Sequence, residues 1–258
     1  MRRIRVMPTL LIDRDCRLVK TERFAGRTYI GDPINAVRIF NQKQVDELIL
    51  LDIDAARERR PPSFDAIEDI VSEAFMPVAY GGGIRSLDDI VRLLRLGLEK
   101  VVLSTAAFEV PGLIGAAAER CGSQAIAVCL PAKRRLLGRY RTMTRSARTD
   151  TRLDVREAAM SAVEQGAGEI IVYSIDRDGT FQGFDIALLR RVSGAVDVPV
   201  VACGGAATLA DVARAVRDGG CAAVAAGSMF VYQGPRRGVL ITYPDTATLE
   251  RQVYVELA

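Results

Sequence analysis

The stretch Gly81-Gly82-Gly83-Ile84-Arg85-Ser86-Leu87-Asp88-Asp89 decides the fold, because a variant of it occurs a second time in the chain. The second copy, displaced by 122 residues, reads Cys203-Gly204-Gly205-Ala206-Ala207-Thr208-Leu209-Ala210-Asp211. The same displacement relates other matched positions, namely Pro77 and Pro199, Gly97 and Gly219, and Phe108 and Phe230. A constant displacement along most of the chain indicates an internal duplication. We therefore expect two similar halves, about residues 1–121 and 122–258.

Short β-branched runs alternate with longer amphipathic stretches on both sides of these glycines. The expected strands are 4–12, 47–53, 77–80, 101–104, 125–130, 170–174, 198–202 and 222–225. Ser86–Leu96 and Thr208–Val216 are expected helices. Such alternation is typical of βα units on a parallel sheet, and eight strands in 258 residues predict a (β/α)8 TIM barrel. We expect one domain, residues 1–258, built from two half-barrels, with a hairpin excursion at 134–154.

Composition excludes several classes of protein. Hydrophobic residues make up 49% and charged residues 26% of the chain, which allows a large packed core. The net charge of +3 gives no electrostatic case for nucleic acid or an anionic membrane. No apolar run is long enough to span a bilayer, and the N-terminus lacks the pattern of a signal peptide. The five cysteines are scattered and show no CxxC spacing. We therefore expect a cytoplasmic protein without a membrane segment.

The chain contains no histidine. This absence excludes Ser-His-Asp and Cys-His nucleophile pairs, a histidine general base and histidine metal ligands. The carboxylates at expected strand ends are better explained as polar ligand contacts than as metal ligands. We expect neither a metal nor a cofactor.

Each glycine turn follows an expected strand and precedes a helix capped by Ser86 or Thr208. Glycine allows backbone N–H groups to approach an anion, and a helix N-terminus favours negative charge. Each half therefore predicts one phosphate site, and two sites on one face suit a ligand with phosphate at both ends. The predicted phosphate-binding residues are Gly82, Gly83, Ser104 and Thr105 in the first half and Asp178, Gly179, Gly204, Gly205, Gly227 and Ser228 in the second. The alternative, that these glycines only make tight turns, stays open.

Several longer strings carry a family resemblance. They are Gly31-Asp32-Pro33, Asp46-Glu47-Leu48, Leu51-Asp52-Ile53, Gly81-Gly82-Gly83-Ile84, Gly122-Ser123-Gln124-Ala125, Gly166-Ala167-Gly168-Glu169 and Ser174-Ile175-Asp176-Arg177-Asp178-Gly179-Thr180. From about Arg5 to Phe230 the chain resembles the cyclase subunit of imidazole glycerol phosphate synthase. The resemblance implies a barrel that receives ammonia from a glutaminase bound at its N-terminal face. It also implies a bisphosphorylated ribulosyl-formimino nucleotide as substrate, which is cleaved and cyclised.

The two aspartates that serve that family as acid and base are missing. Their positions fall on Leu11 and Pro131, and neither side chain can transfer a proton. Displaced candidates for the acid are Asp13, Asp52 and Asp178. Three further family positions also differ: an asparagine is Ser104, a serine is Cys203 and a threonine is the larger Tyr173.

The charged ring that the family has at its ammonia entrance is complete. The resemblance places it on Arg5, Glu47, Lys100 and Glu169, at the starts of four expected strands. Alternation along the strands predicts that these side chains point into the barrel. An ammonia gate and a structural plug at the barrel floor are equally compatible with this pattern.

Two segments, 31–41 and 226–241, are similar to a paralogous branch associated with amidation of lipopolysaccharide sugars. The resemblance to that branch implies an ammonia-supplying barrel with a glutaminase and a third, sugar-amidating protein. Two other hypotheses remain: a genuine cyclase of histidine biosynthesis that uses a displaced acid, and a bisphosphate-binding pseudoenzyme.

Overall fold

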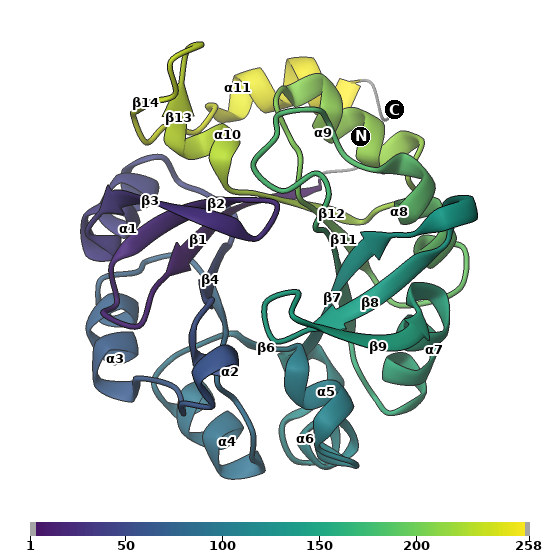
Figure 1. The fold of residues 1–258 in the computed structure, drawn as a ribbon. Helices are drawn as coiled ribbons and strands as arrows, with labels where there is room; N and C mark the ends of the chain where they lie inside the picture. The colour runs from purple at the N-terminus through teal and green to yellow at the C-terminus, as the bar shows by residue number, and fades with distance from the viewer. Residues whose placement is uncertain (1–3, 256–258) are drawn as a thin grey trace.

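The computed structural model describes residues 4–255, and eight of the strands in this part of the chain form a closed parallel barrel (Figure 1). These strands are β1 (Arg5–Ile12), β4 (Leu48–Asp52), β5 (Val78–Gly81), β6 (Lys100–Leu103), β7 (Ile126–Arg134), β10 (Glu169–Ser174), β11 (Val200–Cys203) and β12 (Ala223–Ala226). Pairing of β1 with β12 and of β7 with β10 closes the circle. The predicted (β/α)8 barrel is confirmed. The ends of the expected domain, 1–3 and 256–258, lie outside the described residues.

Helices cover the outside of the barrel (Figure 1). The longer ones are α1 (Pro33–Gln42), α3 (Phe64–Ser72), α4 (Leu87–Arg95), α6 (Leu113–Cys121), α7 (Val155–Glu164), α8 (Ile186–Ser193) and α9 (Leu209–Arg217). The shorter ones are α2 (Ala55–Glu58), α5 (Thr105–Glu109), α10 (Ser228–Val231), α11 (Thr246–Leu249), η1 (Ser123–Ala125), η2 (Leu136–Gly138) and η3 (Glu250–Tyr254). None of the described helices is long and apolar enough to cross a membrane.

The helices after the two glycine turns begin with the same pattern of hydrogen bonds. The hydroxyl of Ser86 accepts from the N–H of Asp89 at the start of α4, and Asp89 accepts from the Ser86 N–H in return. Thr208 and Asp211 make the same reciprocal pair at the start of α9. A helix N-terminus leaves backbone donors unsatisfied, so each reciprocal pair of hydrogen bonds fixes where its helix begins. The expected helices at 86–96 and 208–216 are therefore confirmed to within a residue or two at each end.

Two hairpins rise beside the barrel opening. β8 (Tyr140–Thr144) pairs with β9 (Thr149–Asp154) and extends from β7, as the polar excursion predicted. β2 (Leu18–Glu22) pairs with β3 (Ala25–Gly31) and extends from β1; this hairpin was not predicted. Figure 1 shows the two hairpins on opposite sides of the opening. A third, short hairpin of β13 (Tyr232–Gln233) and β14 (Gly238–Val239) follows α10.

The barrel has two apolar layers. Alternate strand residues point outward and pack beneath the helices in the larger cluster, which includes Leu10, Leu50 and Val128. The inward-pointing set is smaller: Met7, Ile49, Ala79, Val102, Ala127, Cys129, Ile171, Tyr173, Val201, Cys203, Ala223 and Ala225. Four of its twelve members are alanines, and none carries a charge.

Candidate functional site

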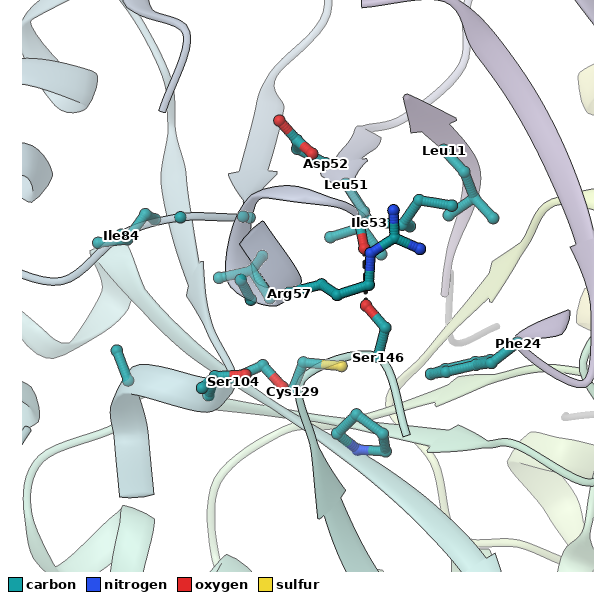
Figure 2. Close-up of a pocket in the computed structure, with 18 of the residues that line it drawn as sticks. Leu11, Phe24, Leu51, Asp52, Ile53, Arg57, Ile84, Ser104, Cys129 and Ser146 are labelled. Carbon is teal, nitrogen blue, oxygen red and sulfur yellow. Dashed lines mark hydrogen bonds between the residues drawn. The ribbon is translucent and has the colours of Figure 1, made fainter. Parts of the chain in front are cut away.

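The main cavity opens at the carboxyl ends of the strands of the first half and measures about 480 Å³ (Figure 2). Its lining includes all four residues that the first half contributes to the predicted phosphate site, Gly82, Gly83, Ser104 and Thr105. Ligand sites of TIM barrels lie on this face, where the loops after the strands converge. The four residues that were predicted to form one phosphate site therefore do share one cavity.

The inner end of the main cavity, which faces the barrel interior and is called the cavity floor below, is uncharged. Leu11, Cys129 and Pro131 all line it, and Leu11 and Cys129 are buried. Burial raises the pKa of the Cys129 thiol to about 12, so this thiol is neutral at pH 7. The two positions at which the resemblance placed the acid and the base thus face the cavity, but with hydrocarbon side chains.

The three displaced acids have separate environments. Asp52 lines the main cavity and accepts from Arg60 Nη2 at 2.7 Å; burial raises the pKa of its carboxyl. Asp13 lines neither cavity; burial opposes ionisation, but hydrogen bonds from Arg17 outweigh it and lower the Asp13 pKa. Asp178 lines the second cavity, described below. Only Asp52 is placed to act in the main cavity, because the other two carboxylates are held elsewhere by their own partners.

Arginine side chains give the wall of the main cavity its charge. The arginines that line it are Arg27, Arg57, Arg59, Arg85 and Arg148, against the carboxylates of Asp52 and Glu109. Asp54, fully buried beneath them, accepts from Arg27 Nη1 at 2.6 Å and lies 2.8 Å from Arg57 Nη2. Sequence reasoning missed this cluster, since its members come from loops and hairpins with no fixed spacing. The surplus of positive charge suits an anionic ligand.

The first glycine turn (Gly81–Gly83) has a steric reason for its glycines. A Cβ on Gly82 would lie 2.6 Å from the Asp52 carbonyl oxygen, and one on Gly83 would lie 2.5 Å from that of Arg60. Both residues also have positive φ, at 131° and 73°. The hydroxyl of Thr105 already accepts from the N–H of Arg145 at 3.0 Å. Tight packing alone therefore requires glycine at these positions, and the features that suit an anion are the cavity and its arginines.

The second cavity adjoins the second glycine turn (Cys203–Gly205) and measures only about 20 Å³. It is lined by the second predicted set, Asp178, Gly179, Gly204, Gly205, Gly227 and Ser228. Lys20, which the sequence did not single out, fills it. Its ammonium donates to the Thr9 carbonyl at 2.7 Å, and a Cβ on Gly227 would lie 2.2 Å from Nζ. Burial lowers the pKa of Lys20 to about 8.

The hairpin turn between β8 and β9 fastens over the main cavity. The Ser146 hydroxyl donates to the Ile53 carbonyl at 2.6 Å, the dashed contact in Figure 2. Arg145 donates to both carboxylate oxygens of Glu109, at 2.7 and 2.9 Å. The cavity is therefore covered on one side by a segment that is distant in sequence from the first half of the barrel.

The four charged residues at the barrel floor form one closed ring. Arg5 contacts Glu47 at 2.5 Å and also pairs with Glu169. Lys100 bridges the same two carboxylates, at 3.1 Å to Glu47 and 3.3 Å to Glu169. Both glutamates are buried, whereas 32% of the Arg5 side chain is exposed. The predicted inward direction is confirmed, and each anion has two cationic partners.

The inward-pointing apolar cluster lies between this floor ring and the main cavity. Arg5 and Met7 share the inner face of β1, and Lys100 and Val102 share that of β6. Val102, Cys129 and Tyr173 belong both to this cluster and to the cavity lining. Uncharged side chains thus connect the ring at one end of the barrel with the cavity at the other.

The chain matches one protein family over most of its length. The sequence profile of the histidine biosynthesis protein family covers residues 5–235. The chain belongs to this family. The matched region spans every barrel strand, both cavities and the floor ring, so the family assignment applies to all the features described above.

The similar proteins are all named as subunits of one enzyme, imidazole glycerol phosphate synthase, and each name is provisional. One from Pseudomonas aeruginosa, imidazole glycerol phosphate synthase subunit hisF2, is 44% identical over 96% of this chain and 98% of its own. One from Leptospira interrogans, subunit HisF, is 41% identical over 97% and 98%. One from Vibrio vulnificus, subunit hisF3, is 43% identical over 100% and 98%. The chain therefore belongs with the proteins that resemble the cyclase subunit of that synthase.

Within residues 4–255, no three His, Cys, Asp or Glu residues are grouped so that they could hold a metal ion. Within the same range the cysteines Cys16, Cys121, Cys129, Cys203 and Cys221 are free thiols.

Proposed function

We propose that this chain is the barrel subunit of a glutaminase-coupled synthase and conducts ammonia from a partner glutaminase to the main cavity. The observation that carries the proposal is a complete floor ring below a cavity lined by Leu11 and Pro131, the positions at which the resemblance places the acid and base of the cyclase. A cyclase would need proton donors and acceptors at the top, whereas an ammonia conduit needs the ring and an uncharged path.

The ring has a geometry that permits opening. Lys100 contacts both Glu47 and Glu169, so the two carboxylates keep a cationic partner if Arg5 leaves. Arg5 is the most exposed of the four, and its guanidinium can move toward solvent or toward a docked protein at a lower desolvation cost than Lys100. We assign Arg5 as the moving member of the gate and Lys100 as the fixed one.

An uncharged interior also suits neutral ammonia. A buried carboxylic acid on the path would convert ammonia to ammonium, which carries a large desolvation cost in an apolar interior. Between the ring and the cavity the inward-pointing cluster supplies alanine, valine, isoleucine, methionine, tyrosine and cysteine side chains, none of them a carboxylic acid. Loss of the two aspartates at the cavity floor then keeps the delivered molecule nucleophilic.

The destination of the ammonia is the second part of the proposal. We propose amidation of a surface polysaccharide sugar, in the cytoplasm, by a third protein that works with this barrel and its glutaminase. The sequence similarity of segments 31–41 and 226–241 to the lipopolysaccharide-amidating branch supports this role, and so do the arginines around the cavity mouth, which suit a phosphorylated ligand.

A second candidate is a cyclase of histidine biosynthesis. Asp52 favours it, because this carboxyl lies in the cavity and burial raises its pKa, as suits a general acid. Its bond to Arg60 opposes that role by holding the charged form.

Turnover of the bisphosphate nucleotide separates the two candidates. The barrel is combined with its cognate glutaminase, glutamine and the ribulosyl-formimino nucleotide, and cyclised product is measured. We expect the barrel to stimulate glutamine hydrolysis without forming product at an enzymatic rate. Cyclisation at ordinary enzyme rates would overturn the ammonia-supply proposal in favour of the cyclase.

A further inference from the structure

Tyr173 stands between the two cavities. It is the only residue common to both linings within the described chain, at the carboxyl end of β10, and only 7% of it is exposed. Its neighbours at alternate positions, Glu169 and Ile171, also point into the barrel. The side chain therefore projects across the barrel top, between the first and second glycine turns.

Contacts on three sides hold the aromatic ring of Tyr173 in that position. The hydroxyl donates to Asp178 Oδ1 at 2.8 Å, while Asp178 Oδ2 accepts from Thr21 Oγ1 at 2.9 Å and from the Phe24 N–H at 3.2 Å. The Phe24 ring packs edge-on, with centroids 4.7 Å apart. On the far side, a Cβ on Gly204 would lie 3.2 and 3.3 Å from two Tyr173 ring carbons. A side chain held at its tip, face and edge cannot swing aside without breaking these contacts.

We infer that Tyr173 is a specificity-determining partition: the main cavity takes a ligand with one phosphate-bearing end, and no single ligand reaches both glycine turns. The cavity sizes agree with this division, since the main cavity holds about 480 Å³ and the second about 20 Å³. The inference rests on the proposed anion site of the main cavity and deepens it. It also replaces the expectation of a ligand with phosphate at both ends.

The chemistry of the lining defines the ligand class further. A phosphomonoester would place its anionic group toward the first glycine turn and the arginines, and its other end against Leu11, Cys129 and Pro131. That floor offers no charged group, so the second end must be uncharged. The substrate class is therefore a phosphate monoester with a neutral far end, positioned where ammonia arrives.

Phosphorylated alkanediols of graded length test the partition. Calorimetry compares monophosphates with α,ω-bisphosphates of four to ten carbons, on the barrel bound to its glutaminase. In the wild type, the bisphosphates should gain at most the twofold statistical advantage at every length. Tyr173→Thr should give one length a gain of tenfold or more, equivalent to about 1.4 kcal/mol. Adding Lys20→Met should remove this gain, because the second phosphate then loses its cationic partner in the second cavity.

Two controls keep the test decisive. Tyr173→Phe keeps the ring and loses only the hydroxyl bond, so it should bind like the wild type; Tyr173→Leu replaces Tyr173→Thr if the latter does not fold. Stimulation of the glutaminase is measured in parallel, because it reports on the partner complex separately from ligand length. A tenfold preference for a bisphosphate in the wild type would overturn the partition. Absence of any gain in the folded smaller variant, Tyr173→Thr or its replacement Tyr173→Leu, would show that Tyr173 does not separate the sites, whatever the glutaminase result.

Discussion

Replacing Lys100 with methionine tests whether the floor ring is a gate or a plug. Lys100 contacts Glu47 and Glu169 at 3.1–3.3 Å, and methionine fills a similar length without the charge. Arg5 would then be the remaining partner of both carboxylates, so it could no longer leave without stranding two buried anions. The variant should hold the gate closed and should not open it.

The stability cost of this change can be bounded from the contacts. Breaking a buried ion pair costs about 3–5 kcal/mol when the partner is left alone. Here Arg5 still compensates both glutamates and is partly exposed, so we expect about 2–4 kcal/mol. For a chain of this size each kcal/mol lowers the melting temperature by about 2–4 °C. The variant should therefore melt about 4–16 °C lower and remain folded at 25 °C.

The assay compares two ways of supplying the same nucleophile. The barrel, its glutaminase and the sugar-amidating protein are combined, and the amidated sugar is measured once with glutamine and once with free ammonia at high pH. Glutamine hydrolysis is followed in parallel. With the gate closed, glutamine-driven formation should fall at least tenfold, while ammonia entering from the open cavity side should still react. Hydrolysis without delivery is the expected signature of Lys100→Met.

Arg191→Met is the matched control, because it removes an arginine pair with Asp154 far from the floor ring. It should leave both modes of supply unchanged. If Lys100→Met lowers the glutamine-driven and ammonia-driven rates in parallel, or lowers only the melting temperature, the ring is a structural plug and the gate assignment is wrong.

Three other outcomes are expected. Restoring carboxylates with Leu11→Asp and Pro131→Asp together should raise ammonia-dependent cyclisation of the bisphosphate nucleotide, since each acid or base typically contributes about 10²–10⁴-fold; no gain over the single variants would contradict the assignment of these positions. Crystals grown in phosphate should show an anion at the first glycine turn, and one at the second turn only with Lys20 shifted into contact with it; empty turns with their N–H groups bound by protein would refute both sites. Burial lowers the Lys20 pKa from 10.5 to about 8, so the folded chain releases this proton first and its stability should rise between pH 8 and 10.5, by about 3 kcal/mol at most; urea titrations in which Lys20→Met shows the same rise would contradict the shift.

The barrel itself could be predicted from the sequence because its signals are local. The glycine turns with Ser86 and Thr208 as caps, the β-branched runs and the constant displacement between halves act within a few residues of one another. The inward direction of the floor ring also follows from strand alternation alone. These features need no knowledge of which segments meet in space.

The hairpin from Leu18 to Gly31 escaped sequence analysis for a physical reason. Its second strand is mostly exposed and carries no apolar alternation, so its pairing with β2 depends on the barrel beneath it. Lys20 in the second cavity and Arg27 in the main cavity lie on this hairpin, so they were not predicted either. Neither residue belongs to a motif that a spacing rule could detect.

The sequence by itself determined the fold, the family and the residue sets of both turns and of the floor ring. Only the tertiary structure decided that Asp52 reaches the main cavity while Asp13 does not, and that Tyr173 lies between the cavities that contain the two predicted phosphate sites. The physical reason is that strand periodicity fixes where a side chain points, whereas the shape of a cavity depends on what loops distant in sequence place opposite it.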